Sequence, residues 1–232
     1  MRSNNMMAVV LGLGLVSCGP PMGPDFDGPH GIKAVNTGGS YAYVVPVEGG
    51  VVLVDTGGDE DPAKLKDAIA GRALLGVLIT HSHTDHIAGA LGLGDVDVFV
   101  GREDIASARG MEDHQGLVQR LTAPFNDPPA VPARLVAVDD GFHFSAGGET
   151  FVAVGMPGHT PGSMAYVFKD VLFSGDAVFG GDNAPVTTPP FVFSDDTTKA
   201  RQSLARVKTL DVTVMLDGHN GKTDDPKSKL DQ

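Results

Sequence analysis

The sequence is poor in cysteine and in basic residues, and each shortage excludes a class of protein. It holds one cysteine among 232 residues, so no disulfide can form within the chain. Only 17 residues are lysine or arginine, against 29 aspartates and glutamates, which gives a formal net charge of −12. A protein that binds nucleic acid through a broad surface needs positive charge there, because the phosphates are negative. We therefore expect a small-molecule substrate and no nucleic-acid partner.

The single cysteine, Cys18, follows an apolar N-terminal segment. Arg2 precedes the apolar run 6–16, and Ser17 comes directly before the cysteine. A run of this length suits a secretory signal and is too short to span a bilayer as a helix. Residues 15–18, Leu-Val-Ser-Cys, resemble the bacterial lipobox, in which the signal is cleaved before a cysteine that is then lipidated. The resemblance implies lipidation at Cys18.

These features predict three segments. Residues 1–17 are the predicted signal peptide, residues 18–31 a Gly/Pro-rich tether, and residues 32–232 the folded domain. The prediction is an exported cell-envelope lipoprotein, facing the periplasm or the exterior, that touches the membrane only through its N-terminal lipid. A soluble secreted protein is the alternative. The sequence leaves the oligomeric state open.

From residue 32 onward, short β-branched runs alternate with helical patterns. Strands are expected at 32–35, 41–47, 51–54, 74–80, 96–100, 134–138, 142–144, 150–154, 164–168, 171–173 and 212–216. Helices are expected at 61–70, 87–93, 105–121 and 197–210. Two strand-rich halves, each followed by helices, predict an α/β (α+β) domain with two packed sheets and helices outside.

Four metal-binding side chains lie within the six residues His-Ser-His-Thr-Asp-His, directly after the strand expected at 74–80: His81, His83, Asp85 and His86. Imidazole and carboxylate are ligands of zinc and similar cations, and open α/β sheets bind ligands at the carboxyl ends of their strands. Three further candidates stand in glycine-containing loops beside expected strands: His159, Asp176 and His219. The pattern predicts a metal centre.

The motifs THSHTDH, PGHTPGS, SGD and DGHNG, in that order, resemble those of the metallo-β-lactamase fold superfamily. Their ligand pattern is closest to the glyoxalase II-like hydrolases, and Val54-Asp55-Thr56-Gly57 matches the family's early Asp-Thr-Gly turn. The resemblance implies a four-layer αββα sandwich with two zinc ions at one edge, iron or manganese being alternatives. It assigns His81, His83 and His159 to the first ion. It assigns Asp85, His86 and His219 to the second, with Asp176 bridging both.

This ligand set implies a hydrolase that uses metal-bound hydroxide to attack an acyl bond of a small molecule, in a thioester, lactone or other ester. The expected catalytic residues are Asp176 and Asp85. Asp176 holds the two metal ions together, and Asp85 accepts or orients the proton of the nucleophile. We expect Asp55 to orient a ligand histidine or the loop. No Gly-x-Ser-x-Gly elbow occurs, and Cys18 lies in the tether.

Other activities remain open. A persulfide dioxygenase-like enzyme would hold one iron through two histidines and an aspartate. A β-lactam hydrolase is less favoured, since true metallo-β-lactamases lack a carboxylate at the place of Asp176. The acidic charge argues against a nuclease. A non-catalytic metal-binding envelope module is the alternative from another class. Because the chain ends soon after His219, without the C-terminal helical domain of glyoxalase II, glutathione thioesters are not the expected substrate.

Substrate contacts are the least specified part of the sequence. Three aromatic residues between Asp176 and His219 are expected to form an apolar wall beside the metals: Phe179, Phe191 and Phe193. Tyr41 and Tyr43 either face the same cleft or pack in the core, and core packing is the commoner role. The histidines outside any motif are expected to be superficial or structural: His30, His114 and His143.

Overall fold

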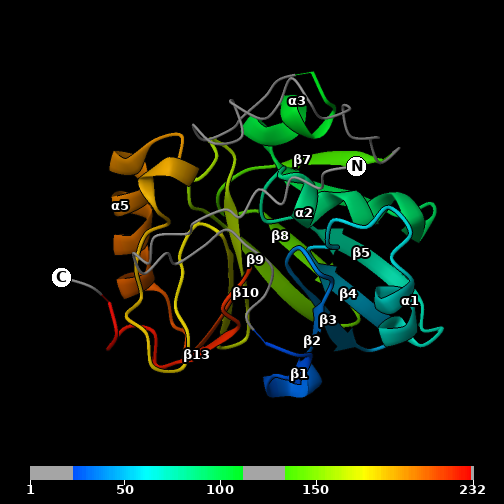
Figure 1. Cartoon of the computed structure of the whole chain (residues 1–232). Helices are drawn as coiled ribbons and strands as arrows, with labels where there is room; N and C mark the ends of the chain where they lie inside the picture. Colours follow the sequence, from blue (N-terminus) through cyan, green and yellow to red (C-terminus); the bar gives the residue numbers. More distant parts are fainter. Residues whose placement is uncertain (1–22, 112–133, 231–232) are drawn as a thin grey trace, which may run out of the picture.

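Two mixed β-sheets packed face to face form the centre of the protein, as the computed structural model shows for residues 23–111 and 134–230 (Figure 1). The first sheet follows the chain order, with seven strands: β1 (Phe26–Asp27), β2 (Lys33–Asn36), β3 (Tyr41–Val47), β4 (Gly50–Val54), β5 (Leu74–Leu78), β6 (Val98–Gly101) and β7 (Leu135–Val138). The second has the order β13-β12-β11-β10-β9-β8: β8 (His143–Ala146), β9 (Glu149–Gly155), β10 (Met164–Phe168), β11 (Val171–Gly175), β12 (Val214–Asp217) and β13 (Lys222–Asp224).

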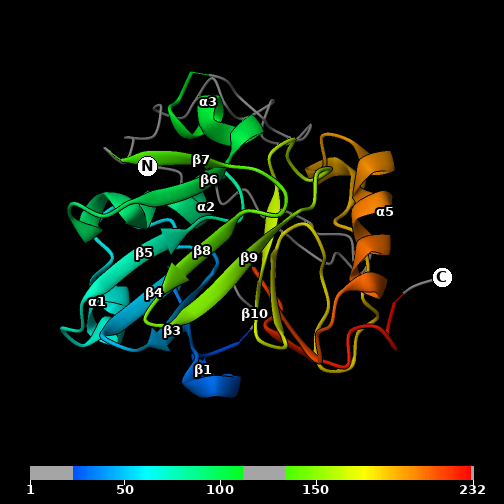
Figure 2. The same cartoon turned by 180° about the vertical axis from the view of Figure 1, so that it is seen from behind.

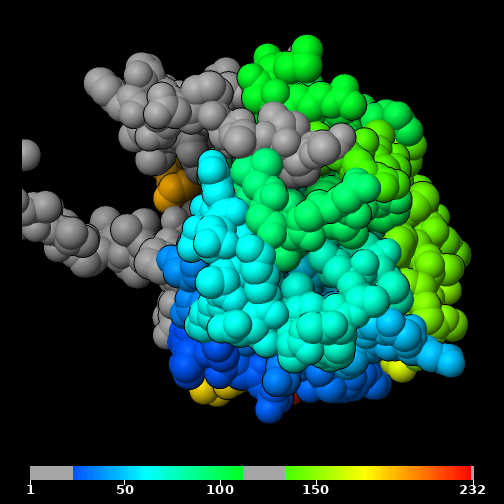
Figure 3. All heavy atoms as spheres, turned by 90° about the vertical axis from the view of Figure 1, so that its right-hand side faces the viewer, coloured from blue at the N-terminus to red at the C-terminus, as the bar shows by residue number. Residues whose placement is uncertain are grey.

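Helices cover the outer face of each sheet (Figures 1 and 2). The α-helices are α1 (Ala63–Ile69), α2 (Thr84–Ile87), α3 (Ile105–Ala108) and α5 (Thr197–Arg206). Short 3₁₀ turns are η1 (Pro29–Gly31), η2 (Ala88–Leu93), η3 (Arg102–Asp104), η5 (Phe191–Phe193) and η6 (Val207–Thr209). Figure 3 looks onto the outer side of the first sheet, where the cyan and green residues of α1, α2 and η2 form the surface. The order helix, sheet, sheet, helix is the predicted αββα sandwich.

Three apolar clusters hold these layers together. The central one lies between the sheets and is rich in aromatic rings, among them Phe151 and Phe168, which stack with centroids 4.6 Å apart. A second cluster joins the first sheet to α1, where Leu65 and Ile69 are buried, and a third joins the second sheet to the α5 side. Side chains of a strand alternate between its two faces, so each strand feeds two clusters. This burial is the main stabilising term of the fold.

Strand direction brings several carboxyl ends to one edge of the sandwich. In the first sheet β4 and β5 are parallel. In the second, β11 and β12 are parallel, and β9 runs the same way because both β9 and β11 are antiparallel to β10. Backbone bonds tie this edge together: Met164 donates to the Thr80 carbonyl, and Tyr41 donates to the Gly218 carbonyl.

The structure corrects the predicted start of the domain. Residues 23–31, assigned to the tether, belong to the fold: Phe26 pairs with Ala34, and the Phe26 ring meets Tyr41 edge-on at 5.3 Å. The Asn36 side chain also donates to the Gly23 carbonyl. The aromatic contact and the β-bridge outweigh the Gly/Pro-rich composition. Residues 1–22, with Cys18, lie outside the described residues.

Other boundaries differ by a few residues. The helix expected at 87–93 begins at Thr84 and continues as a 3₁₀ turn. The helix expected at 105–121 forms an α-helix only to Ala108, and its part beyond residue 111, with His114, lies outside the described residues. The short strands β1 and β13 were not predicted. Within the described ranges, no helix combines the length and apolar character needed to cross a membrane.

Candidate metal centre

All seven predicted ligand residues meet at the edge where the strands end. Each follows a strand directly or within a few residues: the histidine cluster follows β5, His159 follows β9, Asp176 follows β11 and His219 follows β12. Their ligand atoms form three overlapping groups, each with all atoms within 4.8 Å of one another: His81/His83/His159, His81/His86/Asp176 and Asp85/His86/His219. The fold therefore brings these distant segments together at one edge of the sandwich.

The first group is made of three imidazoles. The Nε2 atom of His81 lies 3.0 Å from Nδ1 of His83, and Nε2 of His159 lies 3.1 Å and 3.0 Å from these two atoms. A tetrahedral zinc ion with Zn–N bonds of about 2.0–2.1 Å separates its ligands by about 3.3–3.4 Å. The three nitrogens are thus arranged closely enough to share one cation.

The second group contains the carboxylates. Nε2 of His86 lies 3.7 Å from Oδ2 of Asp85, and Nε2 of His219 lies 3.8 Å from the same oxygen. The buried Asp176 connects the groups, because its oxygens lie 3.0 Å from His219, 3.3 Å from His86 and 3.7 Å from His159. Asp176 is 2% exposed, whereas the Asp85 side chain is 38% exposed.

Burial and neighbouring charges shift the pKa values of the candidate histidine ligands in opposite directions. Burial and the nearby imidazoles hold the pKa of His81 well below its usual range, and burial with His83 lowers the pKa of His159 to about 3. Both rings are therefore neutral at pH 7 and offer lone pairs. Burial alone would lower the pKa of His86, but Asp176, Asp85 and Asp55 raise it well above normal.

The ionisation of Asp176 follows from the same contacts. Burial would raise the pKa of this carboxyl, but His219 and His86 outweigh it and hold the pKa well below its usual range. Burial likewise disfavours charge on His219, yet Asp176 raises the pKa of its ring. Nε2 of His86 points into the cluster, 3.3 Å from Oδ1 of Asp176. Convergent imidazoles around a buried carboxylate fit a divalent cation pair.

Two glycines of the motifs are required by close approach. A Cβ atom on Gly218 would overlap Oδ1 of Asp176 and come 2.8 Å from Cε1 of His86. A Cβ on Gly175, whose φ is +51°, would overlap the Thr80 side chain. Glycine alone provides both this space and the left-handed conformation without strain. The glycines of SGD and DGHNG therefore let the ends of β11 and β12 reach the histidine cluster.

Asp55 contacts both a candidate ligand, His86, and Thr80, which precedes the histidine cluster. It is 1% exposed and its oxygens accept hydrogen bonds from the Thr80 N–H and Thr80 hydroxyl, each at 2.8 Å. Its Oδ2 also lies 2.8 Å from Nδ1 of His86, which leaves the Nε2 atom of that ring directed at the site. Asp55 itself adopts a left-handed conformation with φ 58°. It thus fixes the orientation of one candidate ligand.

The structure reveals two organising carboxylates that were not predicted. Asp104 accepts hydrogen bonds from residues in the loops of both His81 and His159. Asp217 accepts from the N–H groups of His219, Asn220, Gly221 and Gly180, and burial raises its pKa to about 6 despite these bonds. The position of Asp217 beside His219 was a signal for its role. Asp104 carries no comparable signal.

The aromatic residues divide into core and surface. Tyr41 and Tyr43 are 2% exposed, and the Tyr43 hydroxyl donates to the Asp217 carbonyl, so both belong to the core. Phe179 is fully buried, with its ring 6.0 Å from that of His219, so the prediction that it faces substrate is corrected: it packs behind a ligand. Phe191 is 72% exposed.

Phe191 and Phe193 lie in η5, close to the His159 loop. The N–H of Asp195 donates to the His159 carbonyl at 3.2 Å, and that of Asp196 donates to the Gly158 carbonyl at 2.9 Å. These bonds fasten the segment after η5 to the loop that carries His159. The apolar wall predicted from the sequence is thereby reduced to η5, where Phe193 is half-buried.

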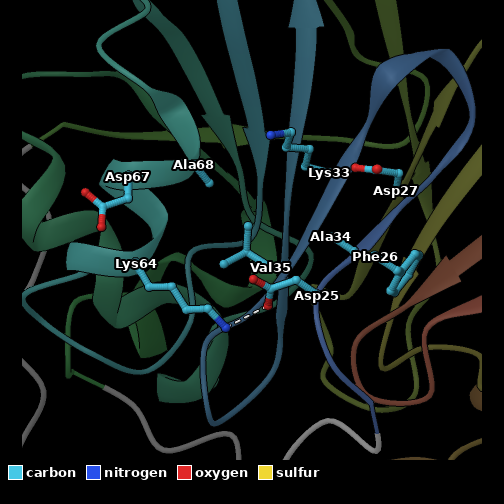
Figure 4. Close-up of a pocket in the computed structure, with 9 residues that line it drawn as sticks. All are labelled: Asp25, Phe26, Asp27, Lys33, Ala34, Val35, Lys64, Asp67 and Ala68. Atoms are coloured by element: carbon cyan, nitrogen blue, oxygen red, sulfur yellow. Dashed lines mark hydrogen bonds and ion pairs between the residues drawn. The ribbon is translucent and has the colours of Figure 1, made fainter.

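The remaining described histidines lie outside the cluster. His30 is half-exposed and bonds Oδ1 of Asp170 at 2.6 Å, and His143 is exposed on β8. A groove of about 350 Å³ between α1 and the β1–β2 edge is also separate, because none of the seven candidate ligands lines it (Figure 4). Within it, Lys64 pairs with Asp25 at 2.6 Å.

Comparison with known proteins agrees with this geometry. The profile of the Metallo-beta-lactamase superfamily matches residues 35–219. A probable metallo-hydrolase, YflN of Bacillus subtilis, is 27% identical over 230 residues, covering 83% of each chain. The hydroxyacylglutathione hydrolase of Acidiphilium cryptum is 30% identical over 183 residues, covering 78% of this chain but only 64% of that relative. A zinc-dependent polyketide-biosynthesis hydrolase of Bacillus velezensis, described as probable, is 32% identical over 109 residues, 46% of this chain and 40% of that relative.

Solved structures share the architecture. The subclass B3 metallo-beta-lactamase BJP-1 of Bradyrhizobium japonicum superposes with a TM-score of 0.64 at 24% identity, covering 87% of this chain and 79% of that one. A B3 enzyme with an active-site glutamic acid gives a TM-score of 0.67 at 18% identity, covering 90% and 86%. At these identities the likeness concerns the fold alone. The profile match, the αββα layers and the edge cluster lead to one conclusion: this chain belongs to the metallo-beta-lactamase superfamily.

Proposed function

We propose that this chain is a dinuclear zinc hydrolase that cleaves the acyl bond of a small molecule: a thioester, a lactone or another ester. The position of Asp176 carries the proposal. A carboxylate this deeply buried, within 3.0–3.7 Å of histidines from both groups, is costly unless cations compensate it. Relatives described as a metallo-hydrolase and as a zinc-dependent hydrolase support the same class of reaction.

The side chains have separable roles in this proposal. His81, His83 and His159 would hold one cation. Asp85, His86 and His219 would hold the other, and Asp176 would contact both. Cations held there would polarise the substrate carbonyl and lower the pKa of a bound water toward about 7. Asp85, the more exposed carboxylate, would accept or orient the proton of the attacking water.

The proposal is tested by a substrate panel on the purified protein loaded with zinc. The panel contains a thioester, a lactone, a simple ester, a β-lactam and a phosphodiester, and His83→Ala is assayed beside the wild type. We expect acyl-bond hydrolysis that His83→Ala abolishes, while His143→Ala, which removes an exposed histidine outside the cluster, retains it. One iron per chain together with oxygen consumption would instead identify a dioxygenase. Metal binding without any turnover would identify a non-catalytic module.

Phe191 is expected to favour substrates with apolar acyl groups. A ring that is 72% exposed next to the His159 loop offers apolar contact area to a bound acyl chain. Replacing it by serine should raise KM for a long-chain acyl ester about tenfold, from the loss of roughly 1.5 kcal/mol of apolar burial. KM for an acetyl ester should stay unchanged. Equal KM values for the two esters in the wild type would contradict the apolar wall.

We also propose that the mature protein is anchored to the cell envelope by a lipid on Cys18, a residue outside the described part of the chain. The lipobox-like residues 15–18 support this location. Cys18→Ser should move the protein from the membrane fraction to the soluble fraction of expressing cells, whereas Ser17→Ala should not. If Cys18→Ser leaves the protein with the membranes, the anchor lies elsewhere.

A further inference from the structure

Asp104 connects two loops that carry candidate ligands. It ends η3 and is fully buried, although it is ionisable. Its Oδ2 accepts from the Ser82 N–H at 2.9 Å and from the Thr160 hydroxyl at 2.8 Å, and its Oδ1 accepts from the Gly162 N–H at 2.6 Å. Both oxygens are therefore engaged by donors from outside its own helix.

The donors belong to opposite sheets of the sandwich. Ser82 stands between His81 and His83, in the loop after β5 of the first sheet, whereas Thr160 directly follows His159 beyond β9 of the second. One carboxylate therefore bridges the loop that carries His81 and His83 and the loop that carries His159. Gly162 is adapted to it, because a Cβ there would overlap Asp104 itself.

The other candidate ligands are fixed by different carboxylates. His86 is held by Asp55, and the backbone of His219 is held by Asp217. Among the described residues, the hydrogen bonds of the Asp104 carboxylate reach only Ser82, Thr160 and Gly162. We propose that Asp104 is a positioning residue that holds His81 and His83 against His159, and so sets the cation affinity of this first group independently of the second. This inference rests on the proposed metal function.

Physical chemistry gives the size of the effect. Hydrogen bonds to an ionised acceptor are about twice as strong as neutral ones, and burial strengthens them further. Replacing the partners that orient metal ligands typically lowers metal affinity by about 10–100-fold. Asp104→Asn replaces one acceptor oxygen by an N–H₂ donor, so at least one of the three hydrogen bonds is lost.

Thr160 provides the milder variants. Thr160→Val keeps the shape of the side chain but removes the hydroxyl that donates a hydrogen bond to Asp104. Thr160→Ser keeps a hydroxyl at this position. To isolate each group, zinc is titrated against a competing chelator in two backgrounds: His219→Ala, which leaves the first group complete, and His83→Ala, which leaves the second. Thermal unfolding of the metal-free proteins records any effect on folding.

In the His219→Ala background we expect Thr160→Val and Asp104→Asn to raise the zinc dissociation constant about 10–100-fold, and Thr160→Ser to restore it. In the His83→Ala background the same changes should leave the constant unaltered. Asp170→Asn serves as control, because Asp170 bonds Thr213 and His30 at the other end of the second sheet. Unchanged affinity in the first background, or equal loss in both, overturns the positioning role. Absence of zinc binding by the parent His219→Ala and His83→Ala proteins contradicts the proposed function itself.

Discussion

Asp176→Asn is expected to lower kcat/KM for the best acyl substrate by about 10³-fold or more. Asparagine keeps the shape of the side chain but removes the negative charge that lies 3.0 Å from His219 and 3.3 Å from His86. Lewis-acid stabilisation of a transition state is worth several kcal/mol, and about 1.4 kcal/mol corresponds to a factor of ten in rate. Steady-state kinetics on zinc-saturated protein measures this loss.

Asp170→Asn is the control, because it removes one negative charge from the protein at a position away from the metal cluster. Asp170 precedes β11 and Asp176 follows it, so the two carboxylates stand at opposite ends of one strand. Asp170→Asn should leave kcat/KM close to the wild-type value. Wild-type turnover by Asp176→Asn with its metals bound would rule out a bridging role for this carboxylate.

Asp55→Asn has the second large expected effect, on metal binding. The substitution leaves a neutral partner opposite Nδ1 of His86 and forces an amide N–H₂ group toward Thr80 or His86. We expect zinc affinity to fall about 10–100-fold and the free energy of unfolding to fall by about 1–3 kcal/mol. Chelator competition and urea denaturation measure the two quantities.

Asp55→Asn is not expected to strain the backbone. Asp55 has φ 58°, and asparagine is among the few residues that adopt this left-handed conformation readily. Asp225→Asn is the matched control, because Asp225 is exposed and also left-handed, with φ 47°. It should change neither quantity. If Asp55→Asn binds zinc as tightly as the wild type, Asp55 does not orient His86.

The clustering of the candidate ligands could be predicted because each belongs to a short motif at a strand end. A strand that stops at a glycine-containing loop places the next polar side chains at the sheet edge. His159, Asp176 and His219 were identified through the ordered set of motifs, because each of them alone would be an ordinary loop residue. Strand β5 likewise appeared as a continuous apolar run before the histidine cluster. Local pattern and topology agreed at these positions.

What escaped prediction depends on contacts between distant residues. Asp104 lies 22 residues from Ser82 and 58 from Gly162, and nothing local marks it as a shared acceptor. Strand β1 has two residues and is held by its pairing with β2 and by the Phe26–Tyr41 contact. Phe179 was assigned to the cleft because it follows Asp176, but its burial places it behind His219. Sequence order does not tell which face of a loop a side chain takes.

The number of zinc ions per chain tests the central claim most directly. The metal-free protein is reconstituted with zinc, freed of excess metal and analysed by mass spectrometry for zinc and protein. Seven convergent candidate ligands with Asp176 between the groups predict two zinc ions per chain in the wild type and one zinc ion per chain in each of His83→Ala and His219→Ala. A wild-type protein that holds at most one ion, or whose zinc content is unchanged in both variants, would contradict the dinuclear centre.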